Sequence, residues 1–264
     1  MNLCLFFEGT GNGVAGRFTN VTRLYNACAE DGSQMRHLES GPGTHFGAYL
    51  RGAIHGYDWW MAFRGAKRWF EANRRPEKAS PEPTKVFLFG FSRGALIARR
   101  FAEWLGKLDE EVAFLGLWDT VDATLGLDVT EECPPNVRAA RHAVSRDEAR
   151  RLFAYVPLKP SAGNAAGRSI EEMAFPGSHS DVGGLFEDNH AIADASLEWI
   201  ARGAERAGLK LKPGALEAIT DPSGGDIVTH DSGGEISNLW GLLGTAKRTL
   251  GNVLFHPLCK SAKP

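Results

Sequence analysis

Short apolar runs of strand length recur along the chain, separated by longer segments in which apolar residues fall at helical spacing. Such runs occupy Leu3–Phe7, Val86–Phe89 and Val112–Trp118, and further short strands are expected near Met35–Leu38 and over Ile170–Phe175. Continuous apolar runs of this length are typical of strands that are buried on both faces of a parallel sheet. The pattern therefore predicts a central sheet rather than half-exposed hairpins.

The segments between these runs predict helices. Trp59, Phe63, Ala66 and Phe70 recur on one helical face, which is the pattern of a helix packed on a core. Helices are expected from a cap at Thr19 or Asn20 to about Ala29, and over Tyr57–Arg75, Arg93–Leu105 and Ala191–Ala207, the last ending near Gly208. Strands and helices that alternate in this way predict an α/β fold with a mainly parallel central sheet flanked by helices.

The chain is expected to form a single domain over residues 1–264. Residues 122–168 are expected to be inserted helices and loops, because proline and glycine clusters interrupt the pattern there. Within this insertion, Ser145 and Glu148 have the spacing of a helix capping box. Residues 209–264 are expected to be a glycine-rich C-terminal extension.

Composition excludes several classes of protein. The net charge is −2, so no basic field indicates a nucleic-acid partner. The four cysteines are scattered and form no C-x-x-C pair, which argues against a zinc site or a disulfide framework. The N-terminus has no basic leader and no apolar run approaches 18 residues, so we expect neither a signal peptide nor a membrane span. The expected location is the cytoplasm of the producing cell.

A G-x-S-x-G motif, Gly90-Phe91-Ser92-Arg93-Gly94, lies between a predicted strand and a predicted helix. This is the context of a nucleophile elbow, where a tight turn requires small residues on both sides of the serine. We therefore predict that Ser92 is a catalytic nucleophile. The alternative is a glycine-lined turn whose serine only caps the following helix.

A serine nucleophile needs a base and an acid that orients the base. Asp119 follows the run Val112–Trp118, and His179 follows a later predicted strand, so both belong at the sheet edge where Ser92 is expected. Their order, Ser then Asp then His, is that of the α/β hydrolases. His142, expected in a helix, is the strongest rival base, and Asp181 is an alternative orienting acid.

The oxyanion hole is expected to combine two backbone N–H groups. Arg93 directly follows the serine and supplies the first, and Gly9 or Thr10, just after the first strand, supplies the second. The alternative for the early loop is a plain glycine turn.

The stretch Gly11–Gly16 matches the dinucleotide motif G-x-G-x-x-G. Three residues separate it from the first strand, and the next helix begins only after Phe18, so no phosphate would lie on the helix N-terminus. We therefore expect no nucleotide cofactor. No metal or organic cofactor is required by the expected chemistry, although loop carboxylates leave room for a structural cation.

Several segments together resemble one family. They are FFEGTGN, TNVTRLYNA, SGPGTHFGAYLRGAIHGY, GFSRGALIAR, LGLWDTVDA and FPGSHSDVGG. In order and spacing, over roughly residues 1–200, they resemble the α/β-hydrolase-like domain of type VI secretion lipase effectors. The resemblance implies phospholipase activity with Ser92, Asp119 and His179 as the triad. It also implies export into rival bacteria and neutralisation by an immunity protein.

Two features depart from the family. Glu8 stands where the family usually has aspartate, and the chain leaves little room for the additional membrane-engaging module of larger members. Apolar residues in Ala48–Phe63 and Leu239–Leu258 could contact a membrane or could simply be core. We therefore expect a phospholipid or ester substrate, and keep as alternatives an esterase for small soluble esters and a non-catalytic binding module.

Overall fold

A computed structural model describes residues 1–10, 19–42, 59–74, 84–122, 130–161, 167–220, 227–231, 248–251 and 253–260. In this part of the chain, seven parallel strands form one sheet in the order β2-β1-β3-β4-β5-β6-β7. The strands are β1 Asn2–Phe7, β2 Gln34–Glu39, β3 Lys85–Phe91, β4 Val112–Trp118, β5 Val137–Ser145, β6 Ser169–Phe175 and β7 Leu254–Phe255. The predicted α/β-hydrolase-like architecture with a parallel sheet is confirmed.

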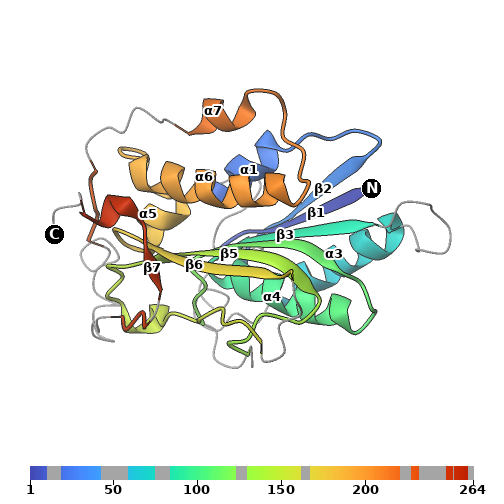
Figure 1. Cartoon of the computed structure of the whole chain (residues 1–264), viewed down its shortest axis with the longest axis horizontal. Coiled ribbons are helices and arrows are strands. Elements are labelled where there is room, and N and C mark those ends of the chain that lie inside the picture. The colour runs from blue at the N-terminus through green and yellow to red at the C-terminus, as the bar shows by residue number, and fades with distance from the viewer. Residues whose placement is uncertain are drawn as a thin grey trace.

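Helices cover both faces of the sheet (Figure 1). The helices are α1 Asn20–Ala27, α3 Trp59–Asn73, α4 Arg93–Gly106, α5 His179–Gly183, α6 Ala191–Arg206 and α7 Ala215–Ile219, with short 3-10 turns at Arg151–Phe153 and Pro257–Lys260. In Figure 1, α1, α6 and α7 lie above the sheet, and α3 and α4 lie below it. None of the helices in the described ranges is both long enough and apolar enough to cross a bilayer.

Alternate residues of the buried strands supply two separate cores. In β1, Leu5 and Phe7 pack with α3 and α4, whereas Cys4 and Phe6 pack with α1 and α6. This double burial explains why the strands are continuous apolar runs. All four cysteines are free thiols.

The direction of strand addition changes at β1. The chain places β2 on one side of β1 and then crosses to place β3 on the other side. In open α/β sheets, the crevice at the carboxyl ends of the strands at such a switch point is the usual place for a ligand site. Thr19 caps α1 as predicted, accepting a hydrogen bond from Thr22 N at 3.3 Å.

The expectation of inserted helices over residues 122–168 is wrong in one important part. Val137–Ser145 forms β5, a strand between β4 and β6. The sequence pattern does not predict this strand because it contains polar residues, whose side chains are paired with residues of neighbouring elements. The Arg141 guanidinium lies 4.8 Å from the ring centroid of Trp199, and His142 pairs with Glu172.

The predicted Ser145–Glu148 capping box is also wrong. Ser145 is the last residue of β5 and hydrogen-bonds to Asp119, while Glu148 forms an ion pair with Arg150. The remaining predicted elements agree with the structure within a few residues where it describes them. The motif Gly11–Gly16, most of Ala48–Phe63 and half of Leu239–Leu258 lie outside the described residues.

Candidate active site

Ser92 occupies the turn between β3 and α4 with a backbone φ of 58° and ψ of −126°. A positive φ is costly for a residue with a side chain, and such strain clusters at functional sites. The hydroxyl of Ser92 makes no capping hydrogen bond to the helix that it precedes. The simple alternative, a serine that caps the helix, is therefore not what the structure contains.

The two motif glycines are required by close packing. A Cβ at Gly90 would lie 2.6 Å from the Gly94 carbonyl oxygen, and a Cβ at Gly94 would lie 2.2 Å from the Phe7 carbonyl oxygen. Both distances are shorter than any side chain tolerates against backbone. The elbow is thus wedged against the end of β1, at the switch point of the sheet.

Asp119 follows β4 directly and is fully buried. Its backbone N–H donates to the Ala143 carbonyl oxygen at 2.7 Å, which holds it against β5. Ser145 donates to the carboxylate twice, from its N–H to Oδ1 at 2.8 Å and from Oγ to Oδ2 at 3.1 Å. The carboxylate therefore has a fixed orientation.

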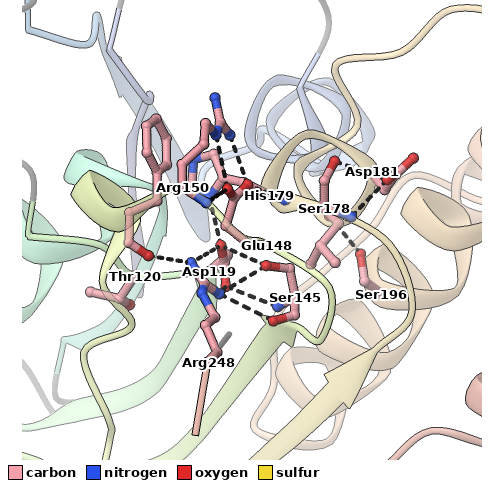
Figure 2. Close-up of polar contacts among 12 residues, drawn as sticks. Asp119, Thr120, Ser145, Glu148, Arg150, Ser178, His179, Asp181, Ser196 and Arg248 are labelled. Carbon is pink, nitrogen blue, oxygen red and sulfur yellow. Dashed lines mark hydrogen bonds and ion pairs between the residues drawn. The ribbon is translucent and has the colours of Figure 1, made fainter. Parts of the chain in front are cut away.

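His179 begins α5, and its Nδ1 lies 2.6 Å from Asp119 Oδ2 (Figure 2). The imidazole stacks on the Phe91 ring at 4.5 Å between centroids and meets the edge of Phe153 at 4.9 Å. Because Phe91 immediately precedes Ser92, this packing places the imidazole beside the elbow. The backbone N–H of His179 also donates to Glu148 Oε2 at 3.2 Å.

The electrostatics suit a neutral imidazole next to an ionised carboxylate. Burial lowers the pKa of His179, although the hydrogen bond and the charge of Asp119 oppose the shift. Burial alone would raise the pKa of Asp119, but the charge of Arg248 and the hydrogen bond from His179 outweigh it and hold the pKa well below its usual range. The pair can therefore accept a proton at neutral pH.

The rival residues have other partners. His142 accepts a hydrogen bond from the Thr120 N–H at Nε2, 3.0 Å away, and its Nδ1 lies 2.8 Å from Glu172 Oε1. Both of its nitrogens are engaged, and it lies on a strand rather than in the predicted helix. Asp181 closes a capping box with Ser178 at the start of α5 and binds His230 Nδ1 at 2.6 Å.

The candidate oxyanion donors lie on the two segments that meet at the elbow. Arg93 is the first residue of α4 and directly follows Ser92. Gly9 N–H is engaged with Glu8 Oε2 at 3.2 Å, whereas the Thr10 hydroxyl is buried and has no hydrogen-bond partner among the described residues. Glu8 itself is fully buried and accepts hydrogen bonds from two threonine hydroxyls, those of Thr19 and Thr22.

The sequence profile of the type VI secretion phospholipase effector Tle1-like catalytic domain matches residues 1–109 and 106–203, which is most of the chain. The chain belongs to this family. A search of curated proteins found no match. The family resemblance inferred from the motifs is confirmed.

Two solved structures share the fold of this Tle1-like domain. An uncharacterized protein from Pseudomonas aeruginosa has a TM-score of 0.52 at 19% identity, and the match covers 82% of this chain and 47% of that one. The Tle1 effector bound to the VgrG spike of a type 6 secretion system has a TM-score of 0.50 at 21% identity, covering 70% and 51% respectively. The Tle1-like domain thus spans about half the length of these relatives.

One prominent residue of the site gave no signal in the sequence. Arg248 reaches the Asp119 carboxylate from a segment 129 positions further along the chain. For metals, no group of three or more His, Cys, Asp or Glu side chains among the described residues could hold an ion. That the chemistry requires no cofactor stays a prediction.

Proposed function

We propose that this Tle1-like domain is a serine hydrolase that cleaves acyl esters of membrane glycerophospholipids. One observation carries the proposal: His179, hydrogen-bonded to Asp119 at 2.6 Å, packs on the residue that precedes the strained Ser92. Family membership supports the lipid substrate. Ser92, His179 and Asp119 are the proposed triad.

In the proposed reaction, Ser92 Oγ attacks the acyl carbonyl while His179 Nε2 takes the hydroxyl proton. Asp119 accepts the hydrogen bond from Nδ1–H and, as a carboxylate, stabilises the imidazolium that forms. The C–O bond to the alcohol then breaks, and His179 protonates the leaving oxygen. Water, activated by the same imidazole, hydrolyses the acyl-serine and restores the enzyme. No metal or organic cofactor takes part in this scheme.

The oxyanion is proposed to bind the N–H of Arg93 and a donor from the loop after β1. Thr10 is the better second donor, because Gly9 N–H already binds Glu8. The Thr10 hydroxyl is buried and has no partner in the described part of the chain, which supports this choice, since an unpaired buried donor is costly unless a ligand uses it. The tetrahedral oxygen would satisfy it.

Delivery and partners belong to the same proposal. The related Tle1 effector was solved bound to a VgrG spike, and we propose that type VI secretion likewise carries this domain into a target cell. An immunity protein in the producing cell is the expected antagonist. Leu254 and Phe255 are 66% and 54% exposed, which supports peripheral contact with a membrane.

The test measures hydrolysis of vesicles of phosphatidylethanolamine and phosphatidylglycerol, with products identified by mass, beside hydrolysis of p-nitrophenyl butyrate. We expect wild type and Ser33→Ala to release fatty acid, and Ser92→Ala to release none. Ser33 is a suitable control because it lies at the amino end of β1, where its carbonyl accepts from Asn2 N. Turnover of only the soluble ester would favour the small-ester alternative, and turnover of neither would favour a binding module.

A further inference from the structure

Arg248 lies under the proposed triad and contacts three separate segments (Figure 2). Its Nη1 donates to Asp119 Oδ1 at 2.6 Å, and its Nη2 donates to Asp119 Oδ2 at 3.1 Å. Nη1 also donates to Ser145 O at 3.1 Å and Ser145 Oγ at 2.8 Å, and Nη2 donates to Phe153 O at 2.6 Å. The guanidinium therefore joins the ends of β4 and β5 to the 3-10 turn whose Phe153 packs on His179.

The Arg248–Asp119 contact is a two-point ion pair in a dry setting. The side chains of Arg248 and Asp119 are 5% and 0% exposed. A planar guanidinium that binds both carboxylate oxygens fixes the rotation of the carboxyl group, which a lysine cannot do. With both oxygens held, Oδ2 can only face His179 Nδ1 in the observed direction.

We infer that Arg248 is a positioning residue of the triad, which fixes the orientation of Asp119 toward His179 and sets the charge of the Asp119–His179 pair. The inference rests on the proposed function, because it assigns a role within that site. It also makes the C-terminal segment part of the active site. That segment is anchored at the sheet edge by β7, where His256 N–H donates to Ala174 O at 2.8 Å.

The charge effect has a definite direction. With His179 neutral, Asp119 and Arg248 cancel, so an added proton gives the site a net positive charge. Without Arg248, the carboxylate of Asp119 has no counter-ion, so a proton added to the Asp119–His179 pair neutralises the site and binds more tightly. This holds whether the proton resides on the imidazole or on the carboxylate. Loss of Arg248 must therefore move the acid limb of the activity profile to higher pH.

Other ionisable groups face the pair and are unchanged by this substitution. Glu148 and Arg150, from the segment after β5, form an ion pair beside the His179 backbone. Burial and the charges of Glu172 and Asp119 raise the pKa of Tyr155, so its phenol stays neutral, and His142 of β5 binds the neighbouring Thr120 N–H. Because these groups are common to wild type and variants, the difference between profiles reports on Arg248.

The experiment compares wild type, Arg248→Gln and Arg248→Lys by kcat and KM on phosphatidylglycerol vesicles, and by the pH dependence of Ser92 labelling with a fluorophosphonate. We expect Arg248→Gln to lose roughly 10- to 100-fold in kcat and in labelling rate. Its acid limb should rise by about one pH unit or more. Arg248→Lys should keep the acid limb of wild type but lose kcat, because it retains the charge without the two-point geometry.

Arg146→Gln is the matched control. Arg146 Nη1 also binds the C-terminal segment, at Cys259 O and 3.0 Å, but its side chain pairs with Asp147 rather than Asp119. We expect this variant to retain wild-type kcat and acid limb. If it reproduces the Arg248→Gln profile, Arg248 acts only as an anchor of the segment and the inference fails.

Chemical rescue covers the case in which Arg248→Gln folds poorly. Arg248→Ala assayed with low-millimolar guanidinium chloride should regain kcat, whereas equal concentrations of sodium chloride or urea should give no gain. Wild-type rates and an unshifted acid limb in folded Arg248→Gln would overturn the inference and leave the proposed function intact. A wild type that neither hydrolyses ester nor reacts with the probe would overturn both.

Discussion

Replacement of Asp119 by asparagine removes one charge while keeping the shape of the side chain. Among the described residues, the groups that hydrogen-bond to the carboxylate are donors: Ser145 N–H and Arg248 Nη1 at Oδ1, and Ser145 Oγ, His179 Nδ1 and Arg248 Nη2 at Oδ2. An amide presents one oxygen and one NH2 group. On whichever side the NH2 group lies, it must face donors, and Arg248 loses its counter-ion.

The expected cost follows from the burial of the pair. Removing one partner of a buried ion pair costs about 3–5 kcal/mol, because the other charge is left uncompensated. This is a large share of the roughly 5–15 kcal/mol that stabilises a typical domain. In the Arg248→Gln background, Asp119→Asn leaves no unpaired cation behind. The loss in free energy of unfolding caused by Asp119→Asn should therefore be about 1–3 kcal/mol smaller in that background than in wild type. Fluorophosphonate labelling of Asp119→Asn should fall by about 10⁴-fold, since the imidazole loses its orienting acceptor.

The assay is urea unfolding at pH 7 of wild type, the two single variants and the double variant, with free energies of unfolding from linear extrapolation. Asp194→Asn is the control, because Asp194 pairs with Arg23 in a buried setting away from the elbow. It should lose stability but keep its labelling rate. The reasoning would be refuted if the stability losses of Asp119→Asn and Arg248→Gln add within about 0.5 kcal/mol in the double variant. It would also be refuted if Asp119→Asn is labelled at the wild-type rate.

Two further predictions concern the elbow and the second Asp–His pair. Gly94→Ala should abolish fluorophosphonate labelling of Ser92 and destabilise the fold, because its Cβ would lie 2.2 Å from the Phe7 carbonyl oxygen. Gly32→Ala is the control and should do neither, because a Cβ there would have no atom within 4 Å. Labelling of Gly94→Ala at the wild-type rate would contradict the packing argument. Burial disfavours the charged form of His230, but its contacts with Asp181 and Asp188 outweigh burial and raise its pKa. Protonated His230 therefore stabilises the folded state at pH values below the pKa of the unfolded chain, and this stabilisation is lost as the pH rises through the folded-state pKa. The difference in unfolding free energy between wild type and His230→Gln should therefore be larger near pH 6 than near pH 9, and a pH-independent difference would contradict this.

The sequence predicted the half of the fold that carries the elbow. β1, β3 and β4 are buried between two helical layers, so they consist of apolar runs that no surface element would show. The sequence did not predict β5, because this strand carries buried polar residues whose hydrogen-bond partners come from distant parts of the chain. His142 is flanked by Thr120 N–H and Glu172, neither of which is close in the sequence. A polar strand of this kind is visible only when its neighbours are known.

The candidate site divides in the same way. Ser92, Asp119 and His179 each follow or begin an element that the sequence predicts, so their meeting at one sheet edge could be expected. Arg248 could not, because it is a single arginine in a glycine-rich segment and nothing local marks it. Its role depends on where β7 docks, which is a long-range property of the fold.

The most direct test of the central claim is covalent trapping of the nucleophile. Intact wild-type protein is treated with a fluorophosphonate at neutral pH, and the adduct is located by peptide mapping. The account predicts a single adduct on Ser92, which is lost in Ser92→Ala and slowed strongly in Asp119→Asn. An adduct on another residue, or no adduct under conditions that label a known serine hydrolase, would contradict it.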